Sequence, residues 1–332
     1  MQVRGVSYMT GVAPDECVRR DLLAIRGELH CNTVMLIGTD IGRLEEAAKT
    51  ALDVGLDVYI RPYLADEPHD VILDHLAMTA EMAERLRSLY PNRVTLLLGS
   101  EFSFTSRGMI PGRWLLLRLQ ILVRPRLRRL FDRRITRRLH RFLRRALSTA
   151  RANFRGPVTY ASGYWENVAW AGFDLIGVNL YRLGDDPAGY ERRLRALVRD
   201  AAKPVVVTEF GCGAFVGADR RGPGSFRAVN WFSDPPNMKK GYTRDEGVQA
   251  RYLSDLIELY ADAGVHGCFV YTFMSPGFPH SSEARYDLDM AGFGLVKAEP
   301  DQPTSWAPKQ AFHSVARHFM IDGTVHDRGR RA

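Results

Sequence analysis

Eight short apolar runs alternate with helical patterns along the chain, and this alternation limits the fold more than any other feature. Each run is bounded by Gly, Pro, Asp or Asn, which is typical of buried strands. Near-continuous apolar strands are what a parallel sheet covered on both faces requires. The predicted strands are residues 2–9, 33–38, 57–64, 93–99, 157–162, 174–181, 203–210 and 267–273.

Helical patterns fill the intervals between these strands. Eight strands with helices between them are the count of a (β/α)8, or TIM, barrel. A doubly wound open sheet is the alternative, but eight units in 332 residues favour the closed barrel, and no Gly-rich phosphate turn follows the first strand. We therefore expect residues 1–332 to form a single α/β domain. The predicted helices are residues 14–29, 41–55, 71–90, 188–202, 243–264 and 307–320.

Composition narrows the class of protein further. The chain is 45% hydrophobic and 25% charged, which is ordinary for a globular protein. No run of 18 apolar residues predicts a membrane span. The N-terminal "MQVRGVSYMTG" has the pattern of a first strand and not of a signal peptide. The four cysteines are far apart and fit no zinc spacing. These features favour a cytoplasmic protein with reduced thiols.

The positive charge is concentrated in one segment, at about residues 105–155. Residues 107–155 hold sixteen arginines, no lysine and one acid, Asp132, so the rest of the chain is net acidic although the whole carries +8. Residues 111–123 are nearly all apolar and could form an interface. From Pro125 onward, apolar residues at spacings of three and four predict an amphipathic helix with an arginine-coated face. These are Leu127, Leu130, Phe131, Ile135, Leu139, Phe142, Leu143 and Leu147.

This arginine-rich segment has three interpretations. An elongated fourth barrel helix with a solvated face is favoured. A surface for acidic membrane lipids or another anionic partner comes second. Nucleic acid comes last, because the segment has few aromatic residues to stack on bases and no recognised binding motif.

Two strands end in a carboxylate. "RVTLLLGSEF" places Glu101 after the fourth strand, and "KPVVVTEFG" places Glu209 at the end of the seventh. The carboxyl ends of barrel strands form the active-site face, so both side chains can point at one central space. Paired carboxylates suit glycoside hydrolysis, with one as nucleophile and the other as general acid and base. The alternative is a pair of exposed acids, or an ion pair with an arginine such as Arg61.

These motifs resemble the retaining glycoside hydrolases of clan GH-A. "TEFG" is similar to the nucleophile strand of that clan and implies Glu209 as nucleophile, while "GSE" implies Glu101 as acid/base. "GVNLY" places Tyr181 where the clan often has a hydroxyl bonded to the nucleophile. The resemblance implies a reaction that needs neither an organic cofactor nor a metal.

The chain departs from the clan pattern at two positions. Ser100 stands where clan members usually have an asparagine that binds the sugar 2-hydroxyl, which suits an altered substrate or a site that has moved away from glycosidase chemistry. Phe273 lies near the position where many members place a tryptophan platform.

A second resemblance runs along most of the chain. "RRDLLAIRGELHCNTV", "GPVTYASGYWENV" and "KPVVVTEFGCG" are similar to actinobacterial proteins described as abortive phage infection proteins. Nothing in these residues indicates an antiphage mechanism.

Further residues are candidates for substrate binding. Arg61, in the third strand, could keep the nucleophile ionised. Tyr164 and Trp165, after the fifth strand, could stack on a sugar ring, and Asn179 alternates with Tyr181 in the sixth. Two long loops, 211–242 and 275–306, follow strands on the catalytic side and are expected to build the site or cover it. The substrate-binding candidates are Tyr8, Arg61, Ser100, Tyr164, Trp165, Asn179, His280, Asp287 and Asp289.

Several of these candidates have a simpler interpretation. Ordinary packing accounts equally well for Tyr164 and Trp165, and loop-stabilising hydrogen bonds account for His280, Asp287 and Asp289. Two aspartates do not complete a metal site. Cys212 is interpreted as a small buried residue, because no base can be paired with it from the sequence.

The sequence thus predicts a retaining glycoside hydrolase or transglycosidase acting on a carbohydrate or a glycosylated small molecule. One alternative is a barrel of the same kind that does other acid/base chemistry on an intracellular metabolite. Another is a non-enzymatic defence or interaction protein that works through the arginine-rich segment.

Overall fold

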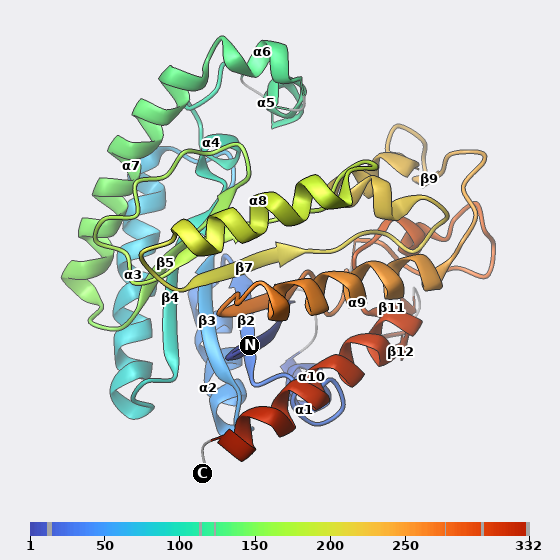
Figure 1. The fold of residues 1–332 in the computed structure, drawn as a ribbon, viewed down its shortest axis with the longest axis horizontal. Coiled ribbons are helices and arrows are strands. Elements are labelled where there is room, and N and C mark those ends of the chain that lie inside the picture. The colour runs from blue at the N-terminus through green and yellow to red at the C-terminus, as the bar shows by residue number, and fades with distance from the viewer. Residues whose placement is uncertain (12–14, 113–114, 123, 276, 300–301, 330–332) are drawn as a thin grey trace.

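The computed structural model describes residues 1–11, 15–112, 115–122, 124–275, 277–299 and 302–329. Eight parallel strands close into a barrel in the order β1–β2–β3–β4–β5–β6–β7–β10, and β10 pairs with β1 (Figure 1). The predicted (β/α)8 barrel is therefore confirmed. The strands are β1 (Val3–Met9), β2 (Thr33–Gly38), β3 (Asp57–Pro62), β4 (Val94–Ser100), β5 (Val158–Gly163), β6 (Ile176–Asn179), β7 (Val205–Phe210) and β10 (Gly267–Val270).

Helices surround the barrel on its outside (Figure 1). Aspartates begin several of them: the side chain of Asp40 accepts from the backbone N–H of Arg43 at 2.9 Å, and Asp186 precedes a helix that starts with Pro187. Both are favoured helix-start signals. The helices of the regular repeat are α1 (Asp15–Gly27), α2 (Ile41–Asp53), α3 (His69–Leu89), α7 (Asp132–Asn153), α8 (Pro187–Asp200), α9 (Glu246–Asp262) and α10 (Gln310–Gly329).

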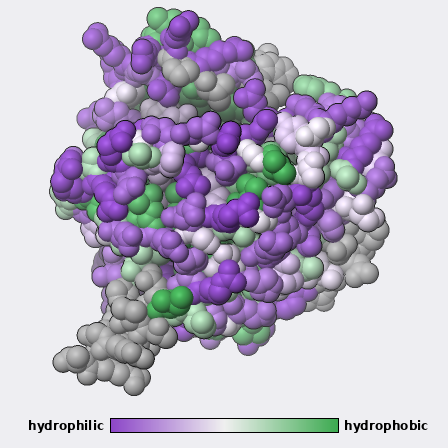
Figure 2. Space-filling model, turned by 45° about the vertical axis from the view of Figure 1, so that its right-hand side comes forward, coloured by the Kyte–Doolittle hydropathy of each residue, from purple (hydrophilic) through white to green (hydrophobic). Residues whose placement is uncertain are grey.

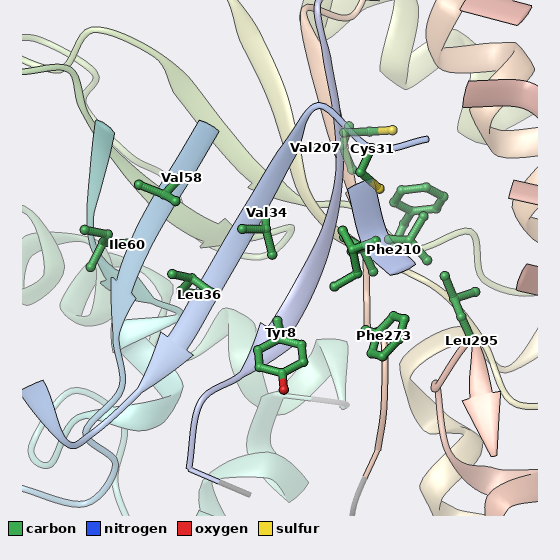
Figure 3. Close-up of a cluster of buried hydrophobic side chains, with 14 of the residues drawn as sticks. Tyr8, Cys31, Val34, Leu36, Val58, Ile60, Val207, Phe210, Phe273 and Leu295 are labelled. Atoms are coloured by element: carbon green, nitrogen blue, oxygen red, sulfur yellow. The ribbon is translucent and has the colours of Figure 1, made fainter. Parts of the chain in front are cut away.

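Two apolar layers hold this architecture together, one on each side of the strands. Alternate residues of a strand point to opposite faces, so Met35 and Ile37 of β2 pack inside the barrel while Val34 and Leu36 pack against the helices. The inner layer is completed by residues such as Tyr59. Figure 3 shows part of the outer layer.

The arginine-rich segment does not continue from Pro125 as one helix, which corrects the prediction from its periodicity. It forms α4 (Phe102–Thr105), α5 (Leu115–Leu122), α6 (Pro125–Arg129) and then α7. A residue before proline is disfavoured in the helical region, and Arg124 is accordingly extended, with φ −108° and ψ 96°. α7 packs on α3 and β4 as the fourth barrel helix. It buries Ile135, Leu139, Phe142 and Leu143.

The two long loops of the catalytic side contain short elements. The loop after β7 holds two 3-10 helices, η1 (Ala218–Arg220) and η2 (Gly222–Ala228), and the hairpin of β8 (Val229–Asn230) with β9 (Asn237–Met238). The loop after β10 holds η3 (Leu288–Ala291) and the hairpin of β11 (Val296–Glu299) with β12 (Gln302–Pro308). Among the helices of the described residues, none combines the length and apolarity that crossing a bilayer requires.

Candidate active site

The carboxylate of Glu209 is held from two sides inside the barrel. The hydroxyl of Tyr181 donates to its Oε2 at 3.0 Å, and the Arg61 guanidinium forms an ion pair with its Oε1. Arg61 lies two residues after Tyr59 on β3 and so faces the interior, where it is 5% exposed; Glu209 is 8% exposed. The sequence left open whether Arg61 contacts this acid, and the structure shows that it does. The guanidinium supplies the counter-charge that a buried carboxylate needs.

Glu101 follows β4 directly and begins the single turn of α4. Its backbone N–H donates to the carbonyl of Ala161 on β5 at 2.9 Å, and its own carbonyl accepts from Phe104 N–H at 2.8 Å. The residue has a left-handed backbone conformation, with φ 48° and ψ 46°. Such a conformation is uncommon for a residue with a side chain, and it clusters at functional sites.

Asn179 connects the two acidic strand ends. Its Nδ2 donates to Glu101 Oε1 at 2.9 Å and to Ser100 Oγ at 3.1 Å, while its Oδ1 accepts from Thr208 Oγ1 at 2.8 Å. Its backbone is also in register with Glu209 across the β6–β7 pair. Asn179 therefore orients Glu101 relative to β6 and β7, and Ser100 lies within the same network.

The two carboxyl groups have different electrostatic surroundings. Burial, and after it the negative charge of Glu209, raise the pKa of Glu101 to about 8, against the opposing hydrogen bond from Asn179. Burial and Glu209 also hold the pKa of Tyr181 well above its ordinary value, so this phenol stays a donor. One carboxyl group therefore keeps its proton, while the other is paired with an arginine. Two neighbouring carboxyl groups that differ in this way can serve as a general acid and as a nucleophile.

A third carboxyl group, Glu166, bonds the turn that follows Glu101 and was missed from the sequence. It accepts from the backbone N–H groups of Ser103 at 2.9 Å and Gly163 at 3.0 Å, and from the hydroxyl of Tyr160 at 2.9 Å. Burial raises its pKa, and its charge contributes to the raised pKa of Glu101. The sequence shows only an acid within "YWENVAW". The contacts of Glu166 could not be predicted, because they depend on the fold of the turn after β5.

Two tyrosines near Glu209 were also missed. Burial raises the pKa values of both Tyr63 and Tyr271, and the charge of Glu209 contributes in each case. Tyr271 packs edge-on against Phe293 at a centroid distance of 5.9 Å. The aromatic side chain near Glu209 that follows strand β10 is therefore Tyr271.

Trp165 and Tyr164 flank the turn that carries Glu101. The indole Nε1 of Trp165 donates to Ser103 Oγ at 2.9 Å, on the turn that follows Glu101. Tyr164 packs edge-on against Trp165 at 5.0 Å and is 51% exposed. The pair lies on the catalytic side of the barrel, where the sequence placed it.

Tyr8 does not face the interior, which corrects one expectation, and Phe273 packs beside it. The Tyr8 hydroxyl donates to Asp21 on α1 at 3.0 Å, and its ring lies 6.1 Å from that of Phe273 (Figure 3). Phe273 is fully buried and packs edge-on against Trp306. Both belong to the layer between strands and helices, so the proposed sugar contact from Tyr8 does not hold.

His280, Asp287 and Asp289 belong to a charge network in the loop after β10. Arg244 donates to Asp287 at 2.8 Å and to Asp289 at 2.9 Å, and the fully buried ammonium of Lys309 lies 3.1 Å from Asp289. His280 Nδ1 lies 2.8 Å from Asp287. These bonds tie the loop to the start of α9 and to the residue before α10, which is the loop-stabilising role that the sequence analysis weighed as the alternative.

Other reactive residue types do not gather into a site. Within the described residues, no group of three or more His, Cys, Asp or Glu could hold a metal ion. Cys212 is fully buried, and burial raises the pKa of its thiol. Its surroundings agree with its interpretation as a small buried residue.

The whole barrel is similar to solved structures of glycoside hydrolases. A GH113 beta-1,4-mannanase in complex aligns with a TM-score of 0.65 and 16% identity over 96% of this chain and 99% of its own. The GH113 beta-mannanase of Alicyclobacillus acidocaldarius aligns with 0.59 and 16% over 96% and 97%. A Bacteroides uniformis beta-glucuronidase aligns with 0.60 and 17% over 96% of this chain and 35% of its own.

These likenesses show the fold: a (β/α)8 barrel similar to those of the glycoside hydrolases named above. No protein-family model and no curated protein matches the sequence. The link to abortive phage infection stays a prediction.

Proposed function

We propose that the protein is a retaining glycoside hydrolase or transglycosidase whose substrate is a carbohydrate or a glycosylated small molecule. Glu209 is the nucleophile, Glu101 is the general acid and base, and Tyr181 orients the nucleophile. The observation that carries the proposal is the contrast between the two acids. Glu209 is paired with Arg61, whereas Glu101 has a pKa of about 8 and holds a proton at neutral pH.

The first half-reaction follows from these positions. Glu209 attacks the anomeric carbon and forms a glycosyl ester, while Glu101 gives its proton to the leaving oxygen. Tyr181 and Arg61 hold the attacking carboxylate in place, which lowers the entropic part of the barrier.

The second half-reaction reverses the role of Glu101. Ester formation removes the negative charge of Glu209, which is the second largest cause of the raised pKa of Glu101. The pKa of Glu101 therefore falls at this step, and its carboxylate can take a proton from the incoming water or acceptor hydroxyl.

The test is a screen of aryl glycosides, with β-mannosides and β-glucuronides first because similar folds carry those names. We expect turnover by the wild type and a loss of at least about a thousandfold in Glu209→Gln. A slow substrate should leave a glycosyl mass on the peptide that contains Glu209. Glu283→Gln, an exposed acid of the loop after β10, is the matched control.

Glu101→Gln separates the roles further. An aryl leaving group needs little protonation, so this variant should still form the ester, and water should then release it slowly. Full activity of both Glu→Gln variants on a glycoside that the wild type cleaves would contradict the assignment. The wild type could instead be inactive on the whole panel and convert a metabolite that has no glycosidic bond. If that conversion requires both Glu101 and Glu209, the alternative acid/base chemistry would be established.

A further inference from the structure

The outer end of the arginine-rich segment has an unusual surface. We define the basic tip as residues 117–122 and 124–134, which comprise the end of α5, α6 and the start of α7. α5 and α6 stand at the top of Figure 1, beyond the helices that ring the barrel. At that end of the molecule, Figure 2 shows hydrophobic side chains among hydrophilic ones.

Eight exposed arginines on the basic tip and the adjoining turns of α7 have no carboxylate partner within the described part of the chain. Their neighbours differ: Arg128 pairs with Asp132 at 3.6 Å, and Arg145 pairs with Asp70 at 2.8 Å. Surface guanidinium groups left unpaired in such number repel each other and favour an anionic partner. The eight are Arg124, Arg126, Arg129, Arg133, Arg134, Arg137, Arg141 and Arg144.

Three leucines are exposed among these arginines. Leu117 is 51% exposed, Leu127 40% and Leu130 75%. Contact with the phosphates of a nucleic acid would leave such side chains in water, and the tip has few aromatic residues for stacking on bases. A bilayer surface provides both an anionic layer for the arginines and an apolar boundary for the leucines.

The basic tip is attached to the catalytic end of the barrel. α4 follows Glu101 directly at the carboxyl end of β4, and α5 is the next helix along the chain. The fully buried guanidinium of Arg118 pairs with Asp66 of the loop after β3 and donates to the carbonyl of Ser106 at 3.1 Å. A surface held by the tip would therefore lie beside the active-site end.

We infer that the basic tip docks on an anionic lipid bilayer, with its arginines on the lipid phosphates and Leu117, Leu127 and Leu130 in the interfacial layer. Docking places the carboxyl ends of the barrel strands next to the membrane. The inference does not depend on the proposed hydrolase activity, so Glu209→Gln should bind the bilayer as the wild type does.

The test measures co-sedimentation of the full chain with phosphatidylcholine vesicles that contain phosphatidylglycerol, compared with phosphatidylcholine alone. We expect binding only to the anionic vesicles, weakening as salt rises. Replacing Arg126, Arg129, Arg133 and Arg134 with Gln should lower the partition coefficient on the order of a thousandfold. The matched control replaces four exposed arginines elsewhere, Arg19, Arg155, Arg192 and Arg193.

A second variant tests the leucines at constant charge. Leu127→Ser with Leu130→Ser should weaken vesicle binding roughly tenfold. Both residues are exposed, so circular dichroism should show an unchanged fold. A random-sequence DNA duplex is the competing probe. Equal losses of vesicle binding in the tip and control arginine variants would overturn the inference, as would no binding to anionic vesicles at low salt. Tight DNA binding would also overturn it, if the leucine variant binds DNA as the wild type does and neither binds vesicles.

Discussion

Glu101→Gln should stabilise the folded chain at alkaline pH, although it removes a proposed catalytic group. The pKa of Glu101 is raised to about 8 from an ordinary value near 4.5, chiefly by burial and then by Glu209. Between these two values the folded chain keeps a proton that the unfolded chain releases. The free energy of unfolding therefore falls as pH rises from 4.5 to 8, and it levels off above 8.

The size of this effect follows from the same two pKa values. A gap from about 4.5 to about 8, at 1.36 kcal/mol per pKa unit, corresponds to an upper limit of about 5 kcal/mol. Relaxation around the buried charge reduces it, so we expect at least about 2 kcal/mol. A glutamine has the same shape, carries no charge, and keeps an oxygen that can accept from Asn179.

The assay is urea unfolding of the wild type and Glu101→Gln at pH 5, 7 and 9. The variant's advantage should be near zero at pH 5, grow through pH 7 and be largest at pH 9. Glu46→Gln, at an acid 77% exposed, is the control and should show no such trend. A difference between wild type and Glu101→Gln that stays constant within about 0.5 kcal/mol over this range would refute the reasoning.

Three further predictions concern the surroundings of the site. Tyr181→Phe should fold normally but lower kcat about ten- to a hundredfold on a cleaved aryl glycoside, because Glu209, the proposed nucleophile, loses a hydrogen-bond donor. Glu166→Gln should lower the pKa of Glu101 by removing a nearby negative charge, which is measured as a downward shift of the alkaline limb of kcat/KM. Lys309→Met should lower the free energy of unfolding by about 3 kcal/mol in urea titrations, because Asp289 loses a buried partner; an unchanged value would contradict that pairing.

The barrel was predictable from local patterns, whereas the direction of individual side chains was not. Strands covered on both faces are apolar on both, so their sequence does not indicate which residues face the interior. Tyr8 was expected inside for this reason and lies against α1 instead. Tyr271 and Phe273 both follow β10, and only the closed sheet determined that Tyr271 approaches Glu209 while Phe273 packs outward.

The arginine-rich segment shows the same limit in a helix. Its apolar spacing correctly marked Ile135, Leu139, Phe142 and Leu143 as the buried face of α7. The same spacing continues to Leu127 and Leu130, which are exposed because the chain breaks at Pro125 and again before Asp132. Periodicity records which residues share a helix face, but a buried face also needs another element to cover it.

The sequence by itself determined eight strands, their order along the chain and the two that end in Glu101 and Glu209, because strand propensity and strand ends are local properties. Only the tertiary structure decided that Arg61 pairs with Glu209 and that Glu166 bonds the turn after Glu101. Closing the barrel brings together side chains separated by 148 positions in the first pair. Charges in such a site shift the pKa values of their neighbours more strongly than the same charges would in water, because the protein interior screens them less.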